Sequence, residues 1–132
     1  MDEKWSRSDY PVDTDCTINS TDVFSIFDGI RQVQKNNGPW DSINVIIFSD
    51  MINTTRLINM NTKDITVANA SDKGKSICQS LINSKRLTPG ETENLFLTIY
   101  TPGNMNQTAF VYHFWEGFFK QWGLHEDHYN FQ

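Results

Sequence analysis

The chain contains few cysteines and few basic residues, and it lacks any long hydrophobic run. Two cysteines in 132 residues, Cys16 and Cys78, are too few for a disulfide framework or a four-ligand zinc site, so we expect reduced thiols. The 11 Lys and Arg residues against 16 Asp and Glu argue against a general affinity for nucleic acid or anionic lipid. No stretch reaches the roughly 18 apolar residues of a membrane span, and no signal peptide is visible. The sequence therefore predicts a cytoplasmic protein with neither nucleic acid nor a membrane as its partner.

The residues that are present suffice for one folded domain. Apolar residues make up 38% of the chain and aromatic residues 13%, which is enough to build a hydrophobic core. Turn-forming residues dominate positions 1–20, where we expect an N-terminal arm or loop. Positions 124–132 have the composition of a polar C-terminal tail. The domain is therefore expected to span residues 21–123.

Hydrophobic periodicity predicts three helices that alternate with two strands. Helices are indicated by apolar residues at three- and four-residue intervals, and strands by short apolar runs. The segments are 21–35, 71–86 and 110–122 for the helices, and 43–48 and 95–100 for the strands. Gly123 stands where a C-terminal helix cap belongs. The order is typical of an α/β domain with a mostly parallel sheet.

The run from Ile43 to Phe48 indicates that this sheet is incomplete. It is β-branched at four of its six positions, and such a run suits a strand that is covered on both faces in a three-layer domain. Two clear strands make a narrow sheet, however, and they leave this central type of strand at an edge. An edge of that kind invites pairing with another chain. We therefore expect either a further strand within residues 1–20 or a partner that completes the sheet.

Ser49 and Asp50 follow this strand directly. Ligands of α/β domains gather at the carboxyl ends of strands, and a carboxylate beside a hydroxyl suits a hard cation such as Mg²⁺. The structural alternative is that Asp50 caps the following turn by accepting hydrogen bonds from nearby backbone N–H groups. Both interpretations are open at this point.

Three segments resemble the C-terminal half of a von Willebrand factor A-like domain. They are VIIFSDM at 45–51, LFLTIYTPGNMN at 95–106 and AFVYHFWEGFFKQWG at 109–123. The resemblance covers about residues 21–123, and it implies a reduced, three-layer, Rossmann-like form of that fold. It also implies that Asp50 matches an Asp of the family's metal site, with Ser49 where the family often has Thr, and that Thr21 matches a Thr from a loop.

The chain departs from the family pattern at its first strand. The Asp-x-Ser-x-Ser run that follows this strand in the family is absent from the sequence. The remaining oxygen donors are too few for a tight Mg²⁺ site, so the resemblance implies a degenerate metal site, and we expect no bound cofactor. In the family the missing strand lies beside the strand that ends at Asp50. This is the same edge that the strand count leaves open.

Two further features admit a catalytic interpretation. Residues 69–76 resemble a phosphate-binding loop, with Asn69 in place of the first Gly and Lys75 near the end. The structural alternative is an exposed start of a helix, since Asn is a poor substitute for Gly in such a loop. His125 and His128, with two acids between them, have the donor types of a transition-metal site, although solvated tail residues are the commoner outcome.

The last predicted helix carries an aromatic stripe, which includes Phe114, Trp115, Phe118 and Trp122. The stripe is most simply core, but a narrow sheet that leaves it bare would turn it into an interface. The sequence thus predicts a non-catalytic protein–protein interaction module that self-associates or is completed by a partner chain. The alternative is a metal-dependent phosphoester- or nucleotide-handling enzyme that uses Asp50 or the 69–76 loop.

Overall fold

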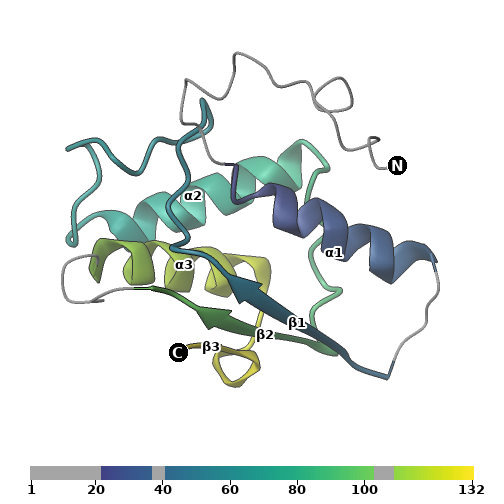
Figure 1. Ribbon diagram of the computed structural model, residues 1–132. Helices are drawn as coiled ribbons and strands as arrows, with labels where there is room; N and C mark the ends of the chain where they lie inside the picture. The colour runs from purple at the N-terminus through teal and green to yellow at the C-terminus, as the bar shows by residue number, and fades with distance from the viewer. Residues whose placement is uncertain (1–21, 37–40, 103–108) are drawn as a thin grey trace, which may run out of the picture.

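The computed structural model, which describes residues 22–36, 41–102 and 109–132, is an α/β fold with a parallel sheet (Figure 1). Its elements are α1 (Ser25–Asn36), β1 (Ile43–Phe48), α2 (Ala70–Asn83), β2 (Leu95–Tyr100), α3 (Ala109–Trp122), the 3-10 helix η5 (Glu126–His128) and β3 (Tyr129–Phe131). The predicted bounds of the two apolar strands are confirmed, and the helices begin and end within a few residues of their predicted limits. The expected arm at 1–20 and the candidate ligand Thr21 lie outside the described residues.

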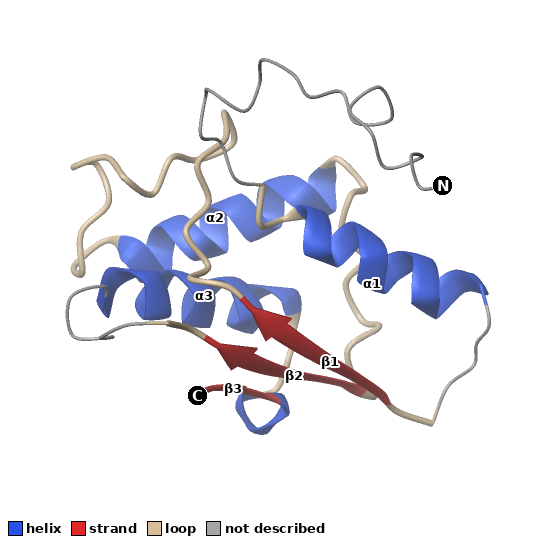
Figure 2. Cartoon of the chain, viewed as in Figure 1, coloured by secondary structure: helices blue, strands red, loops and turns tan. Residues whose placement is uncertain are grey.

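The sheet of the described residues has the strand order β1-β2-β3, and every pair is parallel. Ile43 lies opposite Leu95, so β1 and β2 are in register from their first residues. All three long helices lie on one side of this sheet (Figure 2). Crossovers between parallel strands are nearly always right-handed, and successive crossovers in one direction therefore place their helices on the same face. The described residues form two layers, and the second helical layer of the predicted three-layer arrangement is not among them.

The prediction of a polar tail at 124–132 is wrong, because this segment returns to the sheet and forms its third strand. Gly123 adopts a φ of 100°, as expected of a helix cap, and reverses the chain direction. Leu124 is then only 3% exposed and Tyr129 9% exposed. The amide of Gln132 donates to a β2 carbonyl at 2.7 Å. The high proportion of polar residues concealed a strand of only three residues.

The hydrophobic core lies between the sheet and the helices and is dominated by aromatic rings. Phe27 of α1 stacks on Phe118 of α3 with ring centroids 5.3 Å apart. Every member of the predicted aromatic interface is at most 3% exposed: Phe114, Trp115, Phe118 and Trp122. That interface prediction is therefore wrong, since α1 and the loops cover the stripe that a narrow sheet would have left bare. None of the described helices combines the length and hydrophobicity required to cross a bilayer.

α2 and α3 cross at very short range because each contributes a glycine to the contact. A Cβ added at Gly74 would lie 2.0 Å from the carbonyl oxygen of Phe114, and one at Gly117 would lie 2.2 Å from the carbonyl oxygen of Ser71. The backbones of the two helices thus touch directly. This contact fixes α2 on top of α3 and leaves α3 and α1 to cover the sheet.

Candidate functional site

The face of the sheet opposite the helices carries exposed hydrophobic side chains. Side chains alternate along β1, so that those of Ile46 and Phe48 point away from the helices. Ile46 is 62% exposed, Phe48 79% and the neighbouring Tyr100 of β2 42%. We call Ile46, Phe48 and Tyr100 the apolar strip. The prediction that residues 43–48 are covered on both faces is wrong for the described part of the chain, because its three long helices pack on one face and η5 on the other face contacts β2 and β3.

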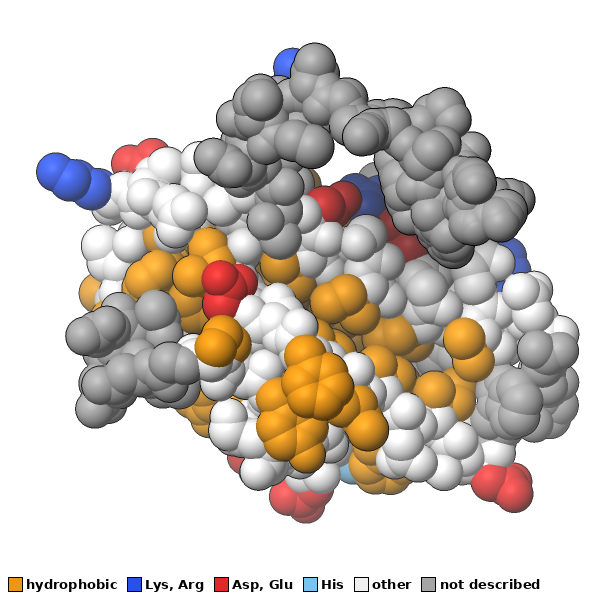
Figure 3. Space-filling view, in the orientation of Figure 1, with side chains coloured by type: hydrophobic (Ala, Val, Ile, Leu, Met, Phe, Trp, Pro, Cys, Tyr) orange, Lys and Arg blue, Asp and Glu red, His pale blue; other side chains and the backbone are white. Residues whose placement is uncertain are grey.

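Phe48 and Tyr100 stack on each other at the carboxyl ends of their strands. Their ring centroids are 5.0 Å apart and their planes differ by 14°. Together with Ser49, Thr101 and Pro102 they line a shallow hollow of about 370 Å³. In Figure 3, hydrophobic side chains gather over the strands on the visible face. Burial of apolar surface releases about 25 cal/mol per Å², so a surface of this kind favours contact with another molecule.

The apolar strip is bounded on the side of β3 by the 3-10 helix η5. His128 of η5 lies against Phe96 of β2, with ring centroids 4.3 Å apart. The buried Nδ1 of His128 has no hydrogen-bond partner among the residues that the structure describes. Since η5 covers the sheet near β2 and β3, the uncovered surface is displaced toward β1.

In the described part of the chain, one edge of β1 is also unpaired. The amide of Ile43 donates to the Asn94 carbonyl at 2.7 Å, and the amide of Ser49 donates to the Tyr100 carbonyl at 3.0 Å, so both face β2. Alternate residues of a parallel ladder face the same neighbour, and the backbone N–H and C=O groups of residues 44, 46 and 48 therefore point away from β2. Within the described ranges no strand lies on that side. β1 also contains no charged residue and no Pro, which are the residues that commonly protect an exposed edge from pairing.

Ser49 and Asp50 are engaged in the turn that follows β1. The Ser49 hydroxyl accepts a hydrogen bond from the amide of Met51 at 2.9 Å, and a carboxylate oxygen of Asp50 accepts one from the amide of Ile52 at 3.0 Å. Met51 is fully buried and adopts a φ of 59°. This is the capping arrangement that was the structural alternative for Asp50. No group of three His, Cys, Asp or Glu side chains in the described ranges is arranged to hold a metal.

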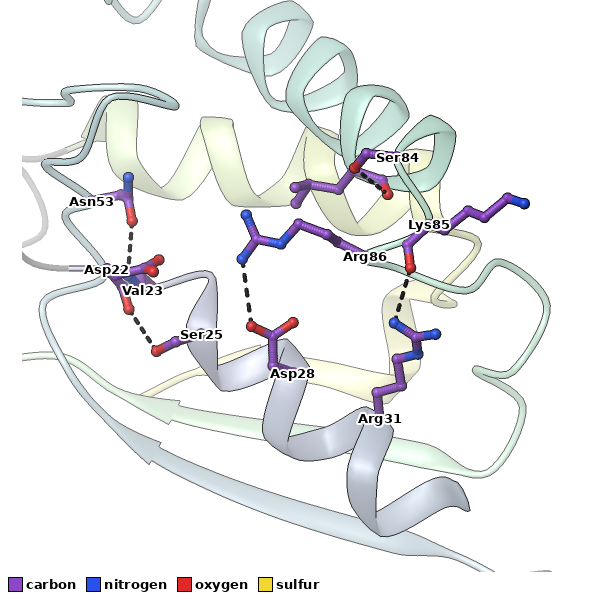
Figure 4. Close-up of polar contacts among 10 residues, drawn as sticks. Asp22, Val23, Ser25, Asp28, Arg31, Asn53, Ser84, Lys85 and Arg86 are labelled. Carbon is purple, nitrogen blue, oxygen red and sulfur yellow. Dashed lines mark hydrogen bonds and ion pairs between the residues drawn. The ribbon is translucent and has the colours of Figure 1, made fainter. Parts of the chain in front are cut away.

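Asn53 is the polar residue that organises this loop, and the sequence interpretation missed it. Its side chain is fully buried and accepts a hydrogen bond from the amide of Val23 at 2.7 Å (Figure 4). The side-chain amide donates to the hydroxyl of Thr55 and to the carbonyl of Ile58, both at 2.9 Å. The loop after β1 is thus tied to the chain just ahead of α1. The only local signal, an Asn-x-Thr triplet, gives no indication of burial.

Polar contacts also join α1 to the chain that follows α2 (Figure 4). A guanidinium nitrogen of Arg31 donates to the carbonyl of Lys85 at 2.9 Å, and Arg86 lies 3.4 Å from a carboxylate oxygen of Asp28. Both members of the second pair are about half exposed, so the ion pair contributes little to stability. These contacts position α1 over the core rather than forming a site.

Residues 69–76 do not form a phosphate-binding loop. α2 begins at Ala70, so Gly74, Lys75 and Ser76 lie inside a helix whose backbone amides are already bonded. Gly74 packs against α3 instead of turning around a phosphate. The side chain of Asn69 accepts a hydrogen bond from Thr66 at 2.8 Å. The segment is therefore a helix start, because the residue that stands for the first Gly closes a local turn.

His125 and His128 take separate structural roles. The Nδ1 atom of His125 accepts a hydrogen bond from the amide of Asp127 at 3.1 Å and caps η5, whereas His128 packs on Phe96. Their ring centroids are 5.8 Å apart. The acids between them do not complete a metal-binding group in the described residues.

The clear pKa shifts among the described residues belong to buried or half-buried groups outside the apolar strip. Burial raises the pKa of the Cys78 thiol to about 12, so this thiol is neutral at physiological pH. Burial, followed by the nearby Glu116 carboxylate, raises the pKa of Tyr129 to about 12. The same two causes raise the pKa of Tyr112. These groups belong to the packing of α2, α3 and β3.

Comparison with protein-family models gives no match, and comparison with curated proteins and with solved structures gives none either. The class of protein is therefore defined by the fold and the surface alone. It is a small α/β domain whose described part has a parallel sheet with three long helices on one face, and an apolar strip beside a strand edge that no described strand pairs with.

Proposed function

We propose that this chain is a non-catalytic protein–protein interaction domain, completed by a second copy or by a partner chain at β1. The observation that carries the proposal is that β1 has both exposed apolar side chains and outward-facing backbone groups. The side chains of Ile46 and Phe48 are 62% and 79% exposed, and the backbone groups of the same residues point outward at the edge. Association at β1 would bury these side chains and pair these backbone groups.

We further propose that the domain is a reduced relative of von Willebrand A-like domains. The one-directional winding of β1, β2 and β3 supports this proposal. In a doubly wound sheet, strands on the other side of β1 carry helices over the opposite face. The resemblance puts the family's first strand beside β1, which is where the described chain has an open edge. The absence of that strand and of the helices beyond it would then account for both the bare face and the open edge.

The polar residues support a non-catalytic domain because local structure already uses them. Ser49 and Asp50 both accept hydrogen bonds from amides of their own turn. Lys75 and Ser76 lie within α2, so their backbone amides are not arranged around a phosphate. The residues that the enzyme alternative requires are thus accounted for by turn and helix formation.

The test combines sedimentation with thermal melting. We expect a weight-average mass above 15.3 kDa that rises with concentration, and a lower mass for Phe48→Ser. Val67→Ser is the matched control, since Val67 is 55% exposed and lies in the turn ahead of α2 rather than in the sheet. A 15.3 kDa monomer at every concentration whose melting temperature rises with Mg²⁺, with the rise lost in Asp50→Ala, would contradict the proposal and support the enzyme.

A further inference from the structure

The edge of β1 that no described strand pairs with is self-complementary. The outward-facing residues are Asn44, Ile46 and Phe48, spaced two apart and centred on Ile46. An antiparallel copy of this strand, related by a two-fold axis through Ile46, places Ile46 opposite Ile46 and Asn44 opposite Phe48. Each of these opposed residues presents both its N–H and its C=O to its counterpart, as in the hydrogen-bonded pairs of an antiparallel ladder. Any other symmetric register leaves some of the outward groups unpaired.

The side chains of β1 fit the same arrangement on both faces of the sheet. On the open face the two Ile46 side chains would meet directly, at the Cβ separation of about 5 Å that is usual for opposed residues. On the helix side Val45 would lie opposite Ile47 of the second copy. Val45 is only partly buried in the single chain, so it has apolar surface left to cover. Both faces of β1 therefore gain apolar contacts when the strand pairs with a second copy of itself.

We call the antiparallel contact between the two β1 strands the seam. No electrostatic repulsion arises at its centre. β1 has the sequence INVIIF and carries no ionisable side chain, although the whole chain has a formal net charge of −5. The charged groups nearest the seam in the chain are Asp41 and Asp50, which flank the strand at its two ends. In the antiparallel register Asp41 of one copy approaches Asp50 of the other. Their repulsion is screened by salt, so the arrangement predicts association that strengthens with ionic strength.

We infer that the occupant of this edge is a second copy of the chain. Two β1 strands pair antiparallel about Ile46, and the sheet becomes continuous in the order β3-β2-β1-β1-β2-β3. The inference rests on the proposed function, which requires only that something binds at β1. The dimer is closed, because a two-fold axis uses the same edge of both copies and leaves no β1 edge for a third.

Engineered cysteines test the register. Opposed residues in a hydrogen-bonded antiparallel pair have Cα atoms about 5.5 Å apart, which is within the range of a disulfide, and a relaxation of about 0.5 Å brings their Cβ atoms within range as well. In a Cys16→Ser background, Ile46→Cys should form a disulfide-linked dimer under mild oxidation, since Cys78 is fully buried. Phe48→Cys is the matched control, because it lies on the same strand and is more exposed but faces Asn44 of the other copy. It should form far less covalent dimer than Ile46→Cys.

A charge at the centre of the seam tests the same contact without covalent chemistry. Ile46→Lys would bring two ammonium groups together on the two-fold axis, so we expect the dimer to dissociate to 15.3 kDa. Val67→Lys makes the same change of charge at a similarly exposed site and should leave the mass unchanged. Circular dichroism and a cooperative melt confirm that each variant is folded.

The possible results separate this inference from the proposed function. A doubled mass, with crosslinking at Ile46→Cys and dissociation by Ile46→Lys, supports both. A doubled mass without crosslinking of Ile46→Cys and without dissociation of Ile46→Lys overturns the β1 pairing. The chain would then self-associate through another surface. A 15.3 kDa monomer without crosslinking overturns the second copy as occupant; if that monomer also melts higher with Mg²⁺ in an Asp50-dependent manner, the proposed function fails as well.

Discussion

Replacing Gly74 with Ala tests the close crossing of α2 and α3. The new Cβ would lie 2.0 Å from the carbonyl oxygen of Phe114 and 2.9 Å from the amide nitrogen of Phe118, both backbone atoms of α3. Ordinary contact begins at 3.4 Å, so α2 must move away by about 1.4 Å. No side-chain rotation relieves this clash, because the opposing atoms belong to a helix backbone.

The expected loss of stability follows from that displacement. A gap of about 0.5–1 Å already forfeits a quarter to a half of the dispersion energy between facing atoms, and overpacking of a core typically costs about 1–3 kcal/mol. Ala gains about 1 kcal/mol over Gly in helix propensity, which offsets part of the cost. Because the displacement of about 1.4 Å exceeds that gap, the upper end of the overpacking cost, about 3 kcal/mol, applies, and we expect the free energy of unfolding of Gly74→Ala to fall by a net amount of about 2 kcal/mol.

Urea unfolding at one fixed protein concentration, followed by tryptophan fluorescence and far-ultraviolet circular dichroism, measures this change. Gly29→Ala is the matched control, because Gly29 lies in α1 and nothing would come within 4 Å of its Cβ. The control should gain about 0.5–1 kcal/mol. If Gly74→Ala is as stable as the original chain or more stable, the helices do not touch as described and the reasoning fails.

Three other substitutions probe the loop, a strained residue and a buried thiol. Asn53→Ala leaves the amide of Val23 without its acceptor and should lower the free energy of unfolding by about 2–3 kcal/mol in the same urea assay, whereas a loss below about 0.5 kcal/mol would contradict its role as the loop's anchor. Lys85→Gly should raise it by about 0.5–1 kcal/mol, because Lys85 has a φ of 65°, and a loss would show that this conformation is not strained. For Cys78, whose pKa rises from 9.0 to about 12 on folding, only the unfolded state loses the proton between these values, so stability should decline as the pH rises from 9.0 toward 12. Cys78→Ala should flatten that decline relative to the original chain, and an equal pH dependence of the two would refute the burial of the thiol.

Much of the secondary structure could be predicted because its signals are local. The apolar runs Ile43–Phe48 and Leu95–Tyr100 have the predicted bounds, and Gly123 takes the left-handed conformation of a helix cap. The strand β3 was missed for the opposite reason. It has only three residues, and its existence depends on pairing with β2 rather than on any pattern of its own.

The sequence predicted where the candidate site lies but not which side chains form it. The sequence indicated an exposed edge at the strand ending in Ser49 and Asp50, and the structure has β1 at the edge of its described sheet. The aromatic residues of α3 were considered as an interface, yet they are buried by Phe27 of α1 and by Phe24 in the turn ahead of it. Apolar periodicity identifies a face that needs covering, but it does not say which element covers it.

The sequence by itself determined the three long helices and the two apolar strands, their order, and therefore an α/β fold with parallel strands, since these follow from interactions between near neighbours in the chain. Only the tertiary structure decided that the chain winds in one direction, that Phe48 and Tyr100 stack on the bare face, and that Asn53 holds the loop to α1. Those outcomes depend on contacts between residues far apart in sequence. Several elements could cover the same apolar surface, and which of them does so is decided only when all elements pack together in one core.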